Sequence, residues 1–268
     1  MGGGDGVERA LADLQELAER LRRDCPWDRE QTTRTIVPHT VEEAYEVADA
    51  AAAGDDAKLV DELGDLLFQT VFLALLLEER DAGDLATVAT AIHEKLVRRH
   101  PHVFGEAELE TAAAVKGRWE ELKREQEARE GIFHDVPASL PSLLYARKVQ
   151  RRAAAAGFDY PDSAGALADL ADELAELREA LAAAPPAAPE TEPDAAVVGE
   201  VGDVLFAVVN VARRLGTDPE LALRAASRRF VERVERAAVL AGEDGRDWTS
   251  LPLAEQDGYF DRAKEALR

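Results

Sequence analysis

The stretch "LVDELGDLLFQTVFLALLLE", residues 59–78, opens with acidic residues and continues as the most apolar run of the chain. The run is too short to span a bilayer and contains Gln69, so it predicts a buried helix. Glu62 and Asp65 lie three residues apart, on one face at the head of that helix. Because uncompensated charge is costly beside so much apolar surface, this pair calls for a positive partner.

A second acidic stretch, "TVEEAYEVADA" at residues 40–50, comes just before it. Thr40 and Glu43 have the spacing of a capping box, which predicts a helix that begins at Thr40 and ends near Gly54. Glu43 and Glu46 share one face of this helix. If the two helices pack antiparallel, four carboxylates converge, and their mutual repulsion predicts a cation between them.

Oxygen ligands without His or Cys suit Mg²⁺, or Mn²⁺ in its place. A carboxylate-bridged iron pair fits less well, because such bundle sites use Glu-x-x-His and neither acidic helix contains His. Carboxylate pairs on helices are also common as solvated surface, and "EExxE" alone favours that alternative. The arrangement returns, however, in "LADLADELAELREAL" and "GEVGDVLFAVVNVARRLG". We interpret this as an internal repeat of an acidic helix, an E-x-G-D helix and a basic helix.

The chain of 268 residues is rich in Ala, Leu, Glu and Arg and has no long alternating apolar pattern, so we expect an all-α protein. Further helices are expected at 57–79, 85–99 and 111–129. We expect a first helical module at 1–130, a linker at 131–142, and a second module at 143–268. The second module is expected to carry a Pro/Ala-rich loop at 182–199.

The net charge of −22 repels nucleic-acid backbones, so general nucleic-acid binding is not expected. A small anionic ligand would need a cation to bridge it to this surface. A single cysteine and the lack of a secretory signal or a membrane-spanning run favour a cytoplasmic protein.

The combination of "CPWDREQT", "VEEAYEV", "DELGDLLFQ", "KLVRRHPHVF" and "GFDY" closely resembles the MazG family of nucleoside triphosphate pyrophosphohydrolases. The resemblance covers nearly the whole chain. It implies a dimeric all-α fold, with modules like four-helix bundles, that uses Mg²⁺ to cut nucleoside triphosphates into monophosphate and pyrophosphate. The family's metal-ligand pattern falls on Glu43, Glu46, Glu62 and Asp65, and again on Glu173, Glu176, Glu200 and Asp203.

Phosphate-binding positions of the family correspond to Lys95, which we also count as catalytic, and to Arg99, Arg229 and Arg233. Lys148 and Arg152 resemble a nucleotide-contacting segment, and Trp27 and Phe260 are candidates for stacking on a base. Spacing alone favours an exposed basic face for the cations of the third helix, and a core or hydrophobic-staple role fits the aromatic residues at least as well. Glu42 is the candidate that orients or deprotonates the attacking water, with a supporting or exposed role as the alternative.

The first copy is the favoured catalytic site, because the second departs from the family with Asp172, Ser227 and Arg229. The second keeps all four expected ligands and stays a candidate. We also retain two alternatives for the whole protein. One is a non-catalytic helical scaffold or regulator with a structural metal, and the other is a pyrophosphatase narrow for one nucleotide.

Overall fold

The computed structural model describes residues 4–105, 111, 131–134, 136–184 and 194–268. Over these residues the regular secondary structure is helical, with no strand, which confirms the all-α prediction. The chain divides into two compact units, Met1–Ala128 and Arg129–Arg268. The residues expected to form a linker at 131–142 are therefore grouped with the second unit. The expected helix at 111–129 lies outside the described residues apart from Thr111, which is in a bend.

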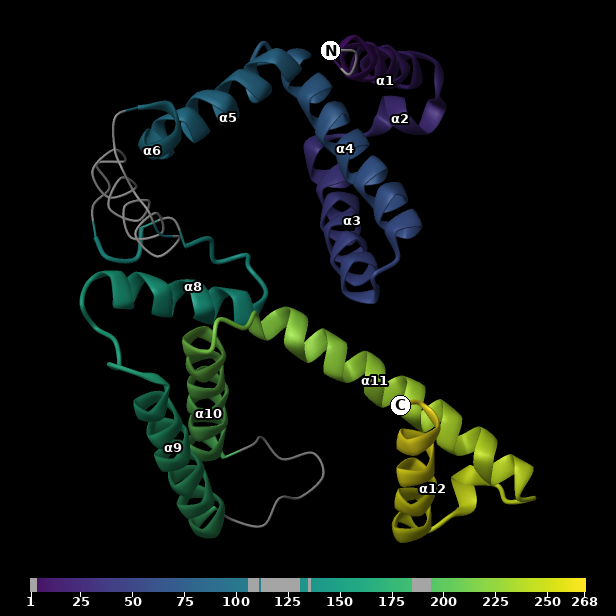
Figure 1. Ribbon diagram of the computed structural model, residues 1–268, viewed down its shortest axis with the longest axis vertical. Helices are drawn as coiled ribbons and strands as arrows, with labels where there is room; N and C mark the ends of the chain where they lie inside the picture. Colours follow the sequence, from purple (N-terminus) through teal and green to yellow (C-terminus); the bar gives the residue numbers. More distant parts are fainter. Residues whose placement is uncertain (1–3, 106–110, 112–130, 135, 185–193) are drawn as a thin grey trace. The chain divides into compact units, whose positions relative to one another are not determined.

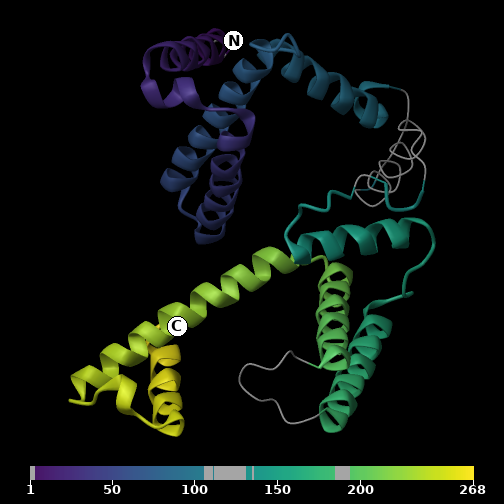
Figure 2. The ribbon, with the colours of Figure 1, turned by 180° about the vertical axis from the view of Figure 1, so that it is seen from behind.

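Unit 1 is built around an antiparallel pair of long helices, α3 and α4, joined by a tight turn (Figure 1). Helix α1 packs on α4, and α5 leaves the pair at the far end of α4, as both views show (Figures 1 and 2). The helices are α1 (Gly4–Asp24), α2 (Pro26–Glu30), α3 (Thr33–Ala53), α4 (Asp56–Glu78), α5 (Leu85–Arg99) and α6 (Pro101–Phe104).

Helix α3 begins seven residues earlier than the sequence suggested, so the prediction of a start at Thr40 is wrong. The capping box is formed instead by Thr32 and Thr35, and the Thr32 hydroxyl accepts from the Thr35 N–H. Pro38 then sits inside the helix and removes one backbone hydrogen bond. The loss of this hydrogen bond is tolerated because the additional turns bring Ile36 into the core, where it is 3% exposed.

The turn between α3 and α4 follows the sequence expectation. Gly54 ends α3 in the left-handed region with φ of 69°, a conformation that favours glycine. The side chain of Asp55 then accepts from the Lys58 N–H and caps α4. This short connection fixes the antiparallel register that brings acidic residues of the two helices together.

The core of unit 1 lies between α3 and α4, where Ile36, Phe72 and Leu76 are buried together. Phe72 is 1% exposed and stacks at a tilt on Phe68, with ring centroids 5.9 Å apart. Burial of each such side chain contributes about 1.5–3 kcal/mol. The predicted buried helix is thus found, although its first turns expose Leu63 and Leu67.

The segment around Trp27 is held by one guanidinium group. Arg22, at the end of α1, donates to the carbonyl oxygens of Asp28 (2.6 Å) and Gln31 (3.0 Å). It also forms an ion pair of 2.6 Å with Glu79, which follows α4. This ion pair lowers the pKa of Glu79, chiefly through the hydrogen bond from Arg22. The α1–α2 corner is therefore tied to the end of α4.

Unit 2 repeats the central motif with α9 and α10 as the antiparallel pair (Figure 1). Helix α8 packs across α10, and α11 contacts α8 and carries α12. The elements are α8 (Ser142–Ala155), α9 (Ser163–Ala183), α10 (Ala195–Arg214), α11 (Pro219–Glu243), the 3-10 turn η1 (Trp248–Ser250) and α12 (Leu253–Ala266).

The Pro/Ala-rich loop expected at 182–199 is shorter than those bounds. Residues up to Ala183 continue α9, and α10 starts at Ala195 after an Asp194 cap. Residues 185–193 of the expected loop lie outside the described part of the chain. Alanine favours helix, so the alanines at both ends of the stretch extend the helices.

Helix α10 is the one described helix whose length and mean hydropathy match a membrane span. Only 11% of its apolar window is buried within unit 2. The evidence for a span is weak, because core helices of globular proteins pass the same test. Glu200 and Asp203 lie in its first turns and face α9, as described next.

Candidate metal and nucleotide site

The α3–α4 pair gathers three carboxylates into a first acidic triad. Glu43 from α3 and Glu62 and Asp65 from α4 each offer an oxygen, and these oxygens lie within 4.8 Å of one another. Glu62 is buried, at 7% exposure, whereas Asp65 is exposed. Lys58, one turn before Glu62, places its Nζ 3.5 Å from a Glu62 oxygen. The triad is thus partly neutralised from one side.

The electrostatics of the first triad are unfavourable without a cation. The pKa of Glu43 is raised by burial first, and then by the charges of Asp65, Glu46 and Glu62. A side-chain hydrogen bond with Glu46 raises it further. Glu46 therefore adjoins the triad beside Glu43 but is not one of its three converging members.

Unit 2 forms a second acidic triad from Glu173 on α9 and Glu200 and Asp203 on α10. Their oxygens also lie within 4.8 Å of one another. Burial raises the pKa of Glu173, followed by the charges of Glu176 and Asp203. Like Glu46, Glu176 stands next to the triad rather than within it.

One buried oxygen supports a cation in the second triad. Glu200 Oε2 is shielded from solvent and has no hydrogen-bond partner. A buried carboxylate oxygen without a partner is costly, and a bound hard cation would satisfy it. The donor set of carboxylate oxygens alone matches such an ion. The two triads therefore fit a divalent metal, and the repeat seen in the sequence corresponds to two equivalent clusters.

The expected phosphate-binding cations lie on other helices of each unit. Lys95 is exposed on α5, and Arg99 is half-buried one turn further on. In unit 2, Arg229 is exposed and Arg233 half-buried on α11. Lys148 and Arg152 are half-buried on α8. The structure brings none of these cations into an ion pair with a triad over its described residues, and their phosphate role stays a prediction.

The expected stacking residues have different surroundings. Trp27 is 54% exposed, and its ring meets His39 edge-on with centroids 6.0 Å apart. Phe260 packs in the hydrophobic cluster between α11 and α12, 5.8 Å from the Phe230 ring centroid. The side chain of Glu42 is 65% exposed and lies 3.7 Å from His39 Nδ1. Glu42 therefore lies on the exposed side of α3 and does not point into the first triad.

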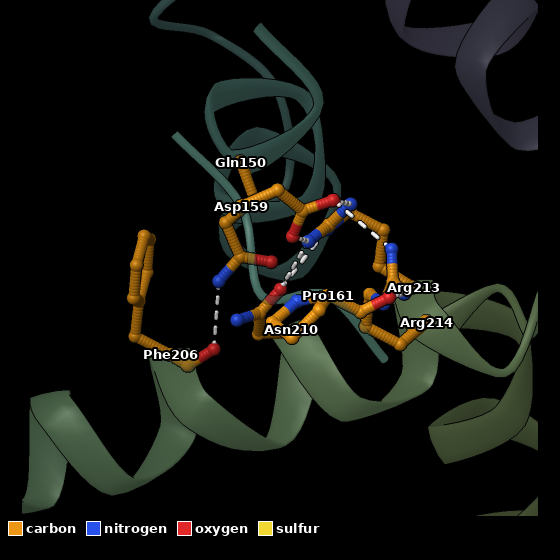
Figure 3. Close-up of polar contacts among 7 residues, drawn as sticks. All are labelled: Gln150, Asp159, Pro161, Phe206, Asn210, Arg213 and Arg214. Carbon is orange, nitrogen blue, oxygen red and sulfur yellow. Dashed lines mark hydrogen bonds and ion pairs between the residues drawn. The ribbon is translucent and has the colours of Figure 1, made fainter. Parts of the chain in front are cut away.

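A polar network at the C-terminal end of α10 was not anticipated from the sequence (Figure 3). Asp159, in "GFDY", pairs with Arg213 (3.1 Å to Nη1) and Arg214 (3.1 Å) of α10. The hydrogen bond from Arg213 lowers the pKa of Asp159. Arg214 also donates to the Pro161 carbonyl oxygen (2.9 Å). These bonds anchor the loop between α8 and α9 to the end of α10.

This loop closes one side of a pocket of about 700 Å³ in unit 2. Glu173 of the second triad is part of the pocket wall, as are the aromatic residues Phe158, Tyr160 and Phe206. Tyr160 donates a hydrogen bond of 2.6 Å to Asp169, which raises the pKa of the phenol to about 12. One sequence signal could have revealed this network. Asn210 is a polar residue at a position of α10 where the helical pattern favours an apolar one.

Fold and site together define an all-α protein with two carboxylate clusters suited to hard divalent cations. The profile of the MazG nucleotide pyrophosphohydrolase domain matches residues 31–104. A nucleoside triphosphate pyrophosphohydrolase of Escherichia coli K12 is 40% identical over 96% of this chain and 97% of its own. The nucleoside triphosphate pyrophosphohydrolase/pyrophosphatase MazG of Thermotoga maritima is 36% identical over 94% of both chains. The chain belongs to the MazG family.

Proposed function

We propose that the protein hydrolyses nucleoside triphosphates to monophosphate and pyrophosphate in a Mg²⁺-dependent reaction. The observation that carries the proposal is the pair of acidic triads, one in each helix pair, with the partnerless buried oxygen of Glu200. Full-length relatives named for this activity support it. Clearing unwanted nucleotides from the cellular pool is the physiological role that we propose for this activity.

The carboxylates would hold the ion, with Mn²⁺ as a substitute for Mg²⁺. Glu43, Glu62 and Asp65 would bind it in unit 1, and Glu173, Glu200 and Asp203 in unit 2. Glu46 and Glu176, which adjoin the triads, would complete each set in this proposal. A bound ion would offset phosphate charge, which a protein with a net charge of −22 needs in order to accept a triphosphate, and it would lower the pKa of a bound water.

In this proposal, the other candidate residues position the substrate and the attacking water. Lys95 and Arg99 supply positive charge on α5, and Arg229 and Arg233 do so on α11. Glu42, on the exposed side of α3, would orient the attacking water in this proposal. Attack by water at the α–β linkage forms a bond to phosphorus, and pyrophosphate leaves with the electrons of the broken bond.

We also propose that the protein acts as a homodimer in the cytoplasm. Within each unit, apolar side chains remain exposed on the helix that supplies two triad ligands. Leu63 and Leu67 on α4 are 48% and 42% exposed, and Leu205 on α10 is 53% exposed. A second copy would cover this surface. Sedimentation velocity tests the proposal, and a monomer at micromolar concentration refutes it.

Pyrophosphate release from each common nucleoside triphosphate, with and without Mg²⁺, tests the activity. Asp65→Ala and Glu200→Ala then assign turnover to the first or second unit. The first unit is favoured because the second departs from the family at Asp172, Ser227 and Arg229. Loss of all turnover in Glu200→Ala alone would refute that ranking. No release with any divalent ion would favour the scaffold with a structural metal. Release from one nucleotide alone would show a narrow enzyme.

A further inference from the structure

The two acidic triads occupy equivalent places in the repeat but differ in the charges beside them. When "DELGD" of α4 is aligned with "GEVGD" of α10, Glu62 corresponds to Glu200. Lys58, one turn before Glu62, then corresponds to Ala196. The first triad therefore has an ammonium group where the second has only a methyl group.

The contacts of the two equivalent glutamates follow this difference. The Glu62 carboxylate is 9% exposed, and its Oε1 lies 3.5 Å from Nζ of Lys58. In the second triad, Oε2 of Glu200 is shielded from solvent and has no hydrogen-bond partner. The shielded carboxylate is thus neutralised by a cation of the chain itself in unit 1, whereas in unit 2 it still lacks a partner.

The other helix of each pair differs in the same sense. When Glu43 of α3 is aligned with Glu173 of α9, His39 corresponds to Asp169. Burial is the largest of the causes that raise the pKa of Glu173, and the charge of Asp169 is one of the others. Unit 2 therefore adds a negative charge to its triad at a position where unit 1 has an imidazole.

One difference between the copies has the opposite sign. Asp61 on α4 corresponds to Gly199 on α10 and adds a negative charge to unit 1. Asp61 is exposed and is not one of the residues that converge in the triad, so solvent screens its charge. The direct contact of Lys58 with the buried Glu62 has the larger effect on that carboxylate.

We infer that Lys58 is a built-in counter-ion that competes with free divalent cations for Glu62 and makes the first triad the weaker site for the free ion. The inference rests on the proposed function. A cation at the first triad is repelled by the ammonium group, whereas at the second it satisfies an oxygen without a partner. A Mg²⁺–triphosphate complex brings negative charge that offsets Lys58. The first triad therefore accepts the ion together with the nucleotide, and the second holds it beforehand.

Calorimetric titration of the full chain with Mg²⁺, without nucleotide, tests this inference on one triad at a time. Glu200→Gln removes a ligand of the second triad and leaves the first to be measured, and Glu62→Gln does the reverse. We expect the second triad to bind free Mg²⁺ more tightly than the first by about fivefold or more.

The decisive variant is Lys58→Ala, made in the Glu200→Gln protein. It should tighten the binding of free Mg²⁺ about fivefold, the upper range for an exposed ion pair. The backbone N–H of residue 58 is kept, so Asp55 still caps α4. Lys58→Arg keeps the positive charge and should bind Mg²⁺ as the parent protein does. Arg9→Ala is the matched control, because it removes the same charge from another exposed ion pair one turn long, with Asp13 at 3.9 Å.

The reciprocal variant transfers the cation to unit 2. Ala196→Lys, made in the Glu62→Gln protein, should weaken the binding of free Mg²⁺ about fivefold. Ala196 is exposed near the start of α10, and lysine is a good helix former, so the substitution should leave the fold intact. With the Mg²⁺ complex of an α,β-methylene triphosphate as the ligand, Lys58→Ala should lose its advantage over the parent.

Each outcome supports or overturns the inference. Tighter binding of free Mg²⁺ in Lys58→Ala, together with weaker binding in Ala196→Lys, supports the counter-ion. Unchanged affinity in Lys58→Ala overturns it, as does an equal gain in Arg9→Ala, which would be a general effect of net charge. An equal gain with the nucleotide complex overturns the order of loading. Absence of Mg²⁺ binding at both triads would overturn this inference and the proposed metal dependence together. Missing pyrophosphate release by the wild type, with Mg²⁺ binding intact, would overturn the activity alone.

Discussion

Neutralising one carboxylate of the second triad should stabilise the metal-free protein and remove its response to Mg²⁺. Glu200→Gln keeps the shape of the side chain and deletes one negative charge. The three oxygens lie within 4.8 Å of one another. At that separation each pair of charges repels by about 3.5 kcal/mol with an effective dielectric constant of about 20, and by about 0.9 kcal/mol in water.

The net gain is smaller than two full pair repulsions. The Asp203 carboxylate is exposed, so solvent screens part of its repulsion with the other two. We therefore expect Glu200→Gln to raise the free energy of unfolding of the metal-free protein by about 1–2 kcal/mol. With Mg²⁺ at a hundredfold excess over its Kd, the wild type gains about 2.7 kcal/mol that the variant lacks.

The assay is calorimetric unfolding of both proteins with EDTA and with saturating Mg²⁺. The order of stability should cross, with the variant ahead in EDTA and the wild type ahead in Mg²⁺. Glu62→Gln is the matched variant in unit 1, where the gain in EDTA should be smaller because Lys58 already lies 3.5 Å from Glu62. A Glu200→Gln protein that is less stable than wild type in EDTA, with an unchanged response to Mg²⁺, would refute the reasoning.

Three further expectations follow from individual contacts. Phe72→Ala should lower the free energy of unfolding by about 3–5 kcal/mol in urea titration, because it empties a fully buried position, whereas Phe104→Ala, at 63% exposure, should change it little. Phenolate absorbance should show Tyr160 ionising near pH 12. The substitution Asp169→Asn should return the pKa of Tyr160 toward 10.0, because the hydrogen bond between the two side chains weakens. An unchanged titration of Tyr160 would contradict this bond. The pKa of Asp159 is lowered in the folded state, so its ion pairs stabilise above the unfolded value of about 3.9 and the contribution is lost as pH falls through the folded value. The stability difference between wild type and Asp159→Asn should therefore shrink on acidification, and a difference independent of pH would speak against the pairing.

Local sequence was enough to place most of the helices. The bounds of α5 coincide with the expected 85–99, because Asp84 caps it and Pro101 prevents its continuation. The start of α3 could not be placed in the same way. Thr32 and Thr40 can both cap a helix, and Pro38 lies between them. The burial of Ile36, which the sequence does not reveal, favours the earlier start.

The acidic residues, too, were placed partly by the sequence and partly by the tertiary structure. The repeat of "ELGD" and "EVGD" with a preceding acidic helix was sufficient to nominate Glu43 and Glu173 and their partners on the next helix. Which carboxylates converge depends on the register of two packed helices, and the structure sets Glu46 and Glu176 beside the triads rather than within them.

The sequence alone determined the helical class and the pairs of acids on each helix, since these depend on residues a few positions apart. It also determined the internal repeat, which is visible as a recurrence of the same motifs. Tertiary structure alone decided the pocket of unit 2. Gln150 and Asn210 are 60 positions apart and share a wall because α8 crosses α10. The physical reason is that the Gln150 amide is held by the Phe206 carbonyl oxygen, 56 positions away. Asn210 is held by Arg213 on the same helix, and the Arg213 guanidinium is held in turn by Asp159, 54 positions away.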